Sequence, residues 1–226
     1  MTAQAVTIEV GPDQQVSGLW LRPPAAAAVL VLAHGAGAGM THRAMEATAE
    51  GLASRGVASL RYNFAYMERG SRRPDTPAVA HAAVRAAVEQ AEDMAPDLPL
   101  FAGGRSFGGR MTSQAQAEAP LPGVRGLVFF AFPLHPPGKP GIERAEHLGK
   151  VSIPMLFLQG ARDEFAQADL LDQTISRLGD RASLHRVVDA DHSFHVPAKT
   201  GLKDAQVLSE ILDVAREWMS ARASEV

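Results

Sequence analysis

Ser106 lies between two evenly spaced glycines in the motif Gly104-Arg105-Ser106-Phe107-Gly108. An apolar run, residues 98–102, precedes the motif and predicts a strand, whereas residues 107–118 predict a helix. A serine on such a turn projects from the fold, because flanking glycines let strand and helix approach closely. The helix N-terminus favours the negative charge that develops during acyl transfer. The motif therefore predicts a nucleophilic serine; the alternative is a glycine-rich turn whose serine is idle.

A nucleophilic serine needs a base, and His192 is the expected one. It follows the predicted strand 184–188 by a few residues, within the segment Asp189-Ala190-Asp191-His192-Ser193-Phe194-His195. His195 is the competing candidate, but it lies three residues farther from the strand end. Both assignments use the order nucleophile, acid, base that this kind of site follows along the chain. Four further histidines are expected to be surface or packing residues rather than the base: His81, His135, His147 and His185.

An acid that orients the histidine is expected after the strand that precedes His192 in the chain. Asp163 occupies this place, in the turn Gln159-Gly160-Ala161-Arg162-Asp163-Glu164 after the predicted strand 153–158. A carboxylate in a loop can equally be a turn residue or a helix cap. Glu164 and Asp169 therefore remain alternative acids.

A glycine-rich loop, His34-Gly35-Ala36-Gly37-Ala38-Gly39, follows another apolar run. It fails the dinucleotide pattern G-x-G-x-x-G, because Met40 or His42 stands at the third glycine position. No Walker motif occurs in the chain, so no nucleotide cofactor is expected. The loop suits an oxyanion hole, with the amides of Ala36 and Phe107 as donors. His34 and Gly35 are candidates for substrate contact.

Elements that could position these residues alternate along the chain: short β-branched runs are followed by longer, Ala-rich amphipathic stretches. The alternation predicts an α/β fold, with a mostly parallel sheet and helices on both faces, in a single domain, 1–226. A turn at Gly11-Pro12-Asp13 predicts an antiparallel hairpin at the sheet edge. Strands are expected at 6–10, 16–21, 27–33, 57–62, 98–102, 124–131, 153–158 and 184–188, and helices near 41–55, 76–95, 107–118, 166–178 and 203–222.

Two segments match neither pattern, and both follow expected strands. They are residues 65–77, which contain Arg69, and residues 132–150, rich in proline and glycine. Open α/β proteins bind ligands at the carboxyl edge of the sheet, so these segments are candidates for a substrate rim, with solvated loops as the alternative. Arg105, Arg61 and Arg69 are candidate partners for a substrate carboxylate, although structural roles are possible for each.

Composition excludes several other classes of function. Hydrophobic residues make up 46% and charged residues 21% of the chain, which is the composition of an ordinary globular protein. The formal charge is −3, so nucleic acid and anionic membranes are not expected as partners. Cysteine is absent, which excludes thiolate catalysis and thiolate zinc sites. No metal site is expected, because His192-x-x-His195 lacks a clear third ligand. The N-terminal residues show no signal-peptide pattern, and the expected location is cytoplasmic. Protein partners are left open.

The segments HGAGAGM, GGRSFGG, LQGARD and ADHSF together resemble the α/β-hydrolase superfamily and, more narrowly, its small dienelactone-hydrolase-like group. The resemblance implies a core of about eight strands and hydrolysis of esters or related acyl compounds without a cofactor. Dienelactone hydrolases have cysteine at the position of Ser106, so their particular substrate is not carried over. The short stretch between residues 131 and 153 leaves no room for a large cap.

Taken together, the sequence predicts a carboxylesterase-like serine hydrolase that cleaves small-molecule esters of small or medium acyl groups. Two alternatives remain open. One is a non-catalytic binding or scaffold protein that keeps this fold. The other is a thioesterase or acyltransferase that uses the same three side chains.

Overall fold

A single eight-stranded sheet forms the centre of the computed structural model, which describes residues 1–224. The strand order is β1-β2-β4-β3-β5-β6-β7-β8. The strands are β1 (Gln4–Gly11), β2 (Gln14–Leu21), β3 (Ala28–Ala33), β4 (Val57–Tyr62), β5 (Leu100–Arg105), β6 (Val124–Phe130), β7 (Met155–Gly160) and β8 (Ala182–Val187).

The first two strands form an antiparallel hairpin at one edge of the sheet, and β2 also pairs antiparallel with β4. All later pairings are parallel, from β4 through to β8. The predicted mostly parallel sheet and its edge hairpin are therefore confirmed. Parallel strands are buried on both faces, and every residue of β3, β4 and β7 is buried.

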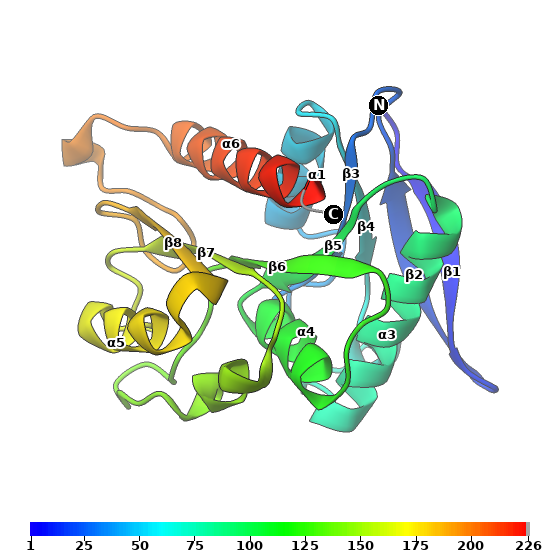
Figure 1. Ribbon diagram of the computed structural model, residues 1–226, viewed down its shortest axis with the longest axis horizontal. Helices are drawn as coiled ribbons and strands as arrows, with labels where there is room; N and C mark the ends of the chain where they lie inside the picture. Colours follow the sequence, from blue (N-terminus) through cyan, green and yellow to red (C-terminus); the bar gives the residue numbers. More distant parts are fainter. Residues whose placement is uncertain (225–226) are drawn as a thin grey trace.

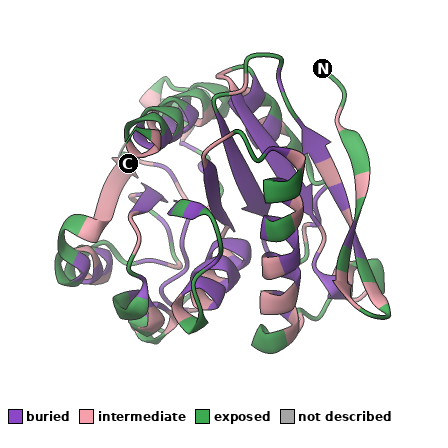
Figure 2. Ribbon diagram, turned by 45° about the vertical axis from the view of Figure 1, so that its right-hand side comes forward, coloured by how far each residue is buried: buried purple, intermediate pink, exposed green. Residues whose placement is uncertain are grey.

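Helices cover both faces of the sheet (Figure 1). On one face α1 packs against α6, and on the other α3 packs against α4, with α5 alongside. Figure 2 shows that the central strands are buried, whereas the edge strand β1 is mostly exposed or partly exposed. The helices expose their outer sides. The helices are α1 (Arg43–Ala53), α2 (Ala65–Glu68), α3 (Pro77–Met94), α4 (Phe107–Glu118), α5 (Ala168–Leu178) and α6 (Asp204–Ala223), with 3₁₀ helices η1 (Glu143–Lys150), η2 (Gly179–Arg181) and η3 (Ala198–Thr200).

The expected long helices are present, but the two unassigned segments are more ordered than their composition indicates. Residues 65–77 contain the short helix α2, and residues 132–150 contain η1. Strand β5 also extends beyond the predicted 98–102, through two glycines to Arg105. A large cap domain is absent from the described residues, as expected. Within residues 1–224, no helix combines the length and the apolar character needed to cross a membrane.

Candidate active site

Ser106 occupies the sharp turn between β5 and α4, with φ 49° and ψ −114°. Positive φ is uncommon for a residue with a Cβ, so the surrounding packing must hold this conformation. The flanking glycines permit that packing. A Cβ added at Gly104 would lie 2.4 Å from the Ala33 carbonyl oxygen, and one added at Gly108 would lie 2.5 Å from the same atom. The motif therefore places the serine on a turn that only small flanking residues allow.

His192 approaches Ser106 from the segment after β8. Its Nε2 lies 2.9 Å from the Ser106 Oγ, and its Nδ1 lies 2.7 Å from an Asp163 carboxylate oxygen. The carboxylate can only accept, so Nδ1 carries the proton and Nε2 accepts from the serine hydroxyl. The ring of Phe165 packs over the imidazole at 4.2 Å between centroids. The histidine side chain is 19% exposed, which leaves it reachable from solvent.

Asp163 is fully buried and its carboxylate accepts three hydrogen bonds. The donors are His192 Nδ1, the side-chain amide of Gln159 at 2.5 Å and the backbone amide of Phe165 at 2.8 Å. Gln159 is held in turn by the Phe132 amide, which donates to its side-chain oxygen. Sequence reasoning did not identify Gln159. Its position four residues before Asp163, as the penultimate residue of β7, is the only signal that points to it.

His195, the alternative base, does not face Ser106. Its Nδ1 lies 2.9 Å from an Asp204 carboxylate oxygen, and its side chain is 62% exposed. That carboxylate raises the pKa of His195 above its ordinary value, first through their hydrogen bond. The four remaining histidines considered above also have protein partners, respectively Glu118, Gln167, Ser113 and Glu210 for His81, His135, His147 and His185.

The loop after β3 lies directly against the nucleophile turn, since a Cβ added at Gly35 would lie 3.9 Å from the Ser106 Cβ. The loop is anchored by residues after β4. The Tyr66 hydroxyl accepts from the Gly37 amide, and the Asn63 side-chain oxygen accepts from the Met40 amide. The amide of Ala36 donates to no acceptor within residues 1–224. The amide of Phe107 begins α4 and has no partner in its own helix. Both amides are thus available to an incoming oxygen.

His34 does not reach the pocket, contrary to expectation. It is fully buried, its Nδ1 donates to the Gly35 carbonyl oxygen, and its Nε2 accepts from the Phe64 amide. Burial lowers the pKa of His34, which keeps the ring neutral. Its role is to hold the loop.

The three arginines singled out from the sequence also lie outside the pocket. Arg61 is buried, with its guanidinium on the Met40 carbonyl oxygen at 3.0 Å. Arg69 pairs with Asp75 at 2.6 Å. Arg105 donates to the His192 carbonyl oxygen at 3.1 Å. Each guanidinium therefore has at least one partner within the protein, while the buried Nε of Arg61 has no hydrogen-bond acceptor.

A pocket of about 350 Å³ opens in front of Ser106. The two segments expected to form the rim both contribute to it, through Pro74 and Asp75 from one and Pro133 and Arg144 from the other. Its remaining lining residues are Ala36, Ser106, Phe107, Arg110 and Phe165. The serine, the free loop amide and both rim segments therefore meet in one cavity.

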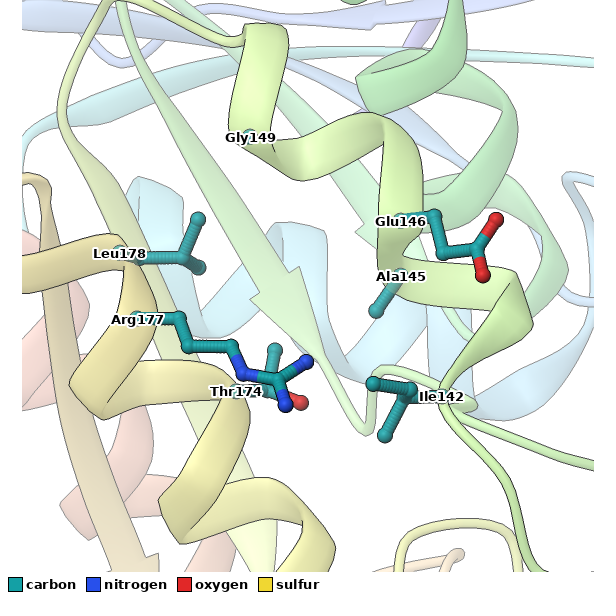
Figure 3. A pocket seen from close by; sticks show the side chains of 7 residues that line it. All are labelled: Ile142, Ala145, Glu146, Gly149, Thr174, Arg177 and Leu178. Carbon is teal, nitrogen blue, oxygen red and sulfur yellow. The ribbon is translucent and has the colours of Figure 1, made fainter.

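A second hollow, of about 230 Å³, lies between η1 and α5 (Figure 3). Arg177 and Leu178 of α5 face Ala145 and Ile142 across it. None of Ser106, His192 and Asp163 lines this hollow, so it is separate from the candidate active site.

An eight-stranded, mostly parallel sheet that presents a serine on a strand-to-helix turn beside a histidine defines the class of the α/β hydrolases. Within that class, the chain belongs to the family described as Alpha/beta hydrolase domain, whose model matches residues 26–220.

Solved structures with the same fold include a dienelactone hydrolase from Anabaena variabilis, with 20% identity, 97% of each chain covered and a TM-score of 0.76. An α/β serine hydrolase homologue from Coxiella burnetii has 19% identity and a TM-score of 0.75 over 96% of this chain and 97% of that chain. An α/β serine hydrolase without a lid from Xanthomonas campestris has 22% identity and a TM-score of 0.73 over 96% and 95%. The expected likeness to dienelactone hydrolases is confirmed at the level of the fold.

Proposed function

We propose that the protein is a serine hydrolase that cleaves carboxylic esters of small or medium acyl groups, with Ser106 as nucleophile, His192 as base and Asp163 as the acid. The observation that carries the proposal is the hydrogen-bond chain from the Ser106 hydroxyl to His192 at 2.9 Å and from His192 to Asp163 at 2.7 Å. The first distance lies in the range that proton transfer to a general base requires. The second is that of a hydrogen bond to a carboxylate, which orients the imidazole. This arrangement activates a hydroxyl that is otherwise a weak nucleophile.

The reaction follows from these positions in two steps. The Ser106 oxygen attacks the ester carbonyl while His192 takes its proton, and Asp163 stabilises the resulting imidazolium. The amides of Ala36 and Phe107 donate to the oxyanion. The carbonyl re-forms, the ester bond breaks, and His192 gives the proton to the departing alcohol oxygen. Water, deprotonated by His192, then attacks the acyl carbon; the bond to the Ser106 oxygen breaks, the acid leaves, and His192 returns the proton to that oxygen.

The pocket supports a small or medium substrate. Its volume of about 350 Å³ is at the lower end of the range for ligand pockets. Its walls include apolar surface from Phe107, Pro133 and Phe165, which suits an acyl chain.

A series of 4-nitrophenyl esters, from acetate to octanoate, tests the proposal on the wild-type protein and on Ser106→Ala in parallel. We expect turnover that falls to background in the variant and a maximum at short or medium chains. Turnover that persists in Ser106→Ala would contradict the role of the serine. Turnover absent from both proteins would favour a binding protein, and hydrolysis of acyl thioesters alone would favour a thioesterase.

A further inference from the structure

Two arginines line the pocket in front of Ser106, and sequence reasoning selected neither. Arg110 lies four residues after the nucleophile, one helical turn along α4. Arg144 belongs to η1, within the second rim segment. They come from separate elements and face the same cavity.

Neither arginine has an acidic partner. The ion pairs within residues 1–224 all use other cations, and the buried Nε of Arg110 has no hydrogen-bond acceptor. The guanidinium carbon of Arg110 lies 5.8 Å from the centroid of the Phe107 ring, a cation–π contact that uses none of its N–H donors. A partly buried cation without an anion is costly, and proteins normally pair it.

The surroundings of Arg110 add to its positive charge. Burial, and next the charge of Arg144, lower the pKa of Arg110 from its ordinary value, so Arg144 places further positive charge near Arg110. His147 neither balances nor adds to this charge, because burial and the charge of Arg110 lower its pKa to about 4 and leave the ring neutral. The one acidic residue of the pocket, Asp75, is already engaged by Arg69 and by the Tyr66 amide. A chain with a formal charge of −3 therefore has a cationic pocket.

We propose that Arg110 and Arg144 bind a carboxylate carried by the substrate, so that the preferred esters are anionic. The guanidinium group presents planar pairs of N–H donors that match the two oxygens of a carboxylate. The inference rests on the proposed function, because it concerns what enters the pocket of Ser106. It assigns recognition of the substrate's charge to two residues that lie outside the hydrogen-bond chain of Ser106, His192 and Asp163.

The test compares esters that differ only in charge. Mono-4-nitrophenyl glutarate and 4-nitrophenyl pentanoate have acyl chains of similar length, one ending in a carboxylate and the other in a methyl group. A second pair, 4-carboxyphenyl pentanoate and its methyl ester at the carboxyl group, places the charge on the alcohol side. The measured quantity is the ratio of kcat/KM for the charged ester to kcat/KM for the neutral ester, after subtraction of the enzyme-free rate.

We expect this ratio to fall about tenfold or more in Arg110→Gln and in Arg144→Gln, for at least one of the two pairs, since a hydrogen bond to a charged group typically contributes that much. The pair that responds identifies the side of the ester that carries the carboxylate. Arg216→Gln, on an exposed position of α6, removes the same charge far from the pocket and should leave the ratio unchanged. An unchanged ratio in both pocket variants, or equal losses on charged and neutral esters, would overturn the inference.

Binding of glutarate to Ser106→Ala, measured by calorimetry, separates this inference from the proposed function. We expect binding that weakens about tenfold when Arg110→Gln is added. Glutarate binding without any ester hydrolysis by the wild-type protein would reject the proposed function alone. Hydrolysis that depends on Ser106, with neither charge preference nor glutarate binding, would reject the inference alone.

Discussion

Arg105 and Arg110 lie on either side of Ser106 and differ in what their guanidinium groups contact. Arg105 ends β5, donates to the His192 carbonyl oxygen and lies over the ring of Phe194 at 5.7 Å. Burial lowers the pKa of Arg105, but the nearby charges of Asp163 and Asp191 oppose that shift. Arg110 has a cation as its charged neighbour and no acceptor for its Nε. An arginine whose guanidinium is hydrogen-bonded within the protein supports the site, whereas one that lines a pocket without an acceptor or an anion is available to a ligand.

Loss of the base should have the largest effect on kcat, and this effect should be the same for neutral and anionic substrates. We expect His192→Ala to lower kcat at least about 10³-fold on neutral and anionic esters alike, because Ser106 then has no proton acceptor. His195→Ala is the matched control and should stay near the wild-type rate, since His195 pairs with Asp204. Steady-state hydrolysis of both 4-nitrophenyl esters measures the effect. Wild-type turnover in His192→Ala would contradict its assignment as base.

Loss of the acid should have the second-largest effect. In Asp163→Asn the side chain keeps its volume but loses the charge that stabilises the imidazolium, and we expect kcat to fall about 10²- to 10⁴-fold. Glu164→Gln changes the exposed neighbouring carboxylate and should have little effect. Rates for the two variants on the same ester decide between Asp163 and Glu164 as the acid. A large loss in Glu164→Gln with none in Asp163→Asn would reverse the assignment.

Arg105→Met should distinguish support of the site from substrate binding. The variant loses the hydrogen bond to the His192 carbonyl oxygen. We expect kcat to fall about tenfold with little change in KM, equally for charged and neutral esters, and to recover in part in Arg105→Lys. A fall confined to the charged ester would give Arg105 the role proposed for Arg110 and would remove the contrast between them.

The smallest expected effect concerns His147 and the dependence of stability on pH. Its folded pKa of about 4 lies below its ordinary value of 6.5, so the unfolded chain binds the proton more readily between these pH values. Its contribution to the free energy of unfolding is full above pH 6.5 and is lost as the pH falls toward 4, by at most about 1.4 kcal/mol per pH unit. His147→Gln should show a shallower decline over this window in urea titrations. An identical decline in both proteins would show that the protonation of His147 does not affect stability.

The fold and the three residues of the hydrogen-bond chain could be predicted from the sequence because local signals specify them. Ser106 lies between glycines after an apolar strand, and Asp163 and His192 each follow a later strand. Parallel strands bring their carboxyl ends to one edge of the sheet, so position after a strand is enough to bring these residues together. The expectation for His34 is wrong: its place after a strand resembles that of a pocket residue, but the backbone groups of Gly35 and Phe64 hold its ring within the core.

The arginines of the pocket were harder to predict. Arg110 lies one helical turn after Ser106, a spacing that the sequence does contain. Arg144 depends on the path of a proline- and glycine-rich segment, which no periodicity describes. Arg61 is a sequence-based candidate partner for a substrate carboxylate, but its side chain is buried near Glu46 and Glu50 of α1. Side chains on a strand alternate between faces, so a correct strand still leaves the direction of each charge open until the register is known.

Covalent labelling with a fluorophosphonate probe tests the central claim, that His192 activates Ser106, most directly. The labelled site is located by peptide mass spectrometry in the wild-type protein, in Ser106→Ala and in His192→Ala. We expect rapid labelling at Ser106 in the wild type, none at that position in Ser106→Ala, and labelling slowed by orders of magnitude in His192→Ala. Labelling at another residue, or an equal rate in His192→Ala, would contradict the account.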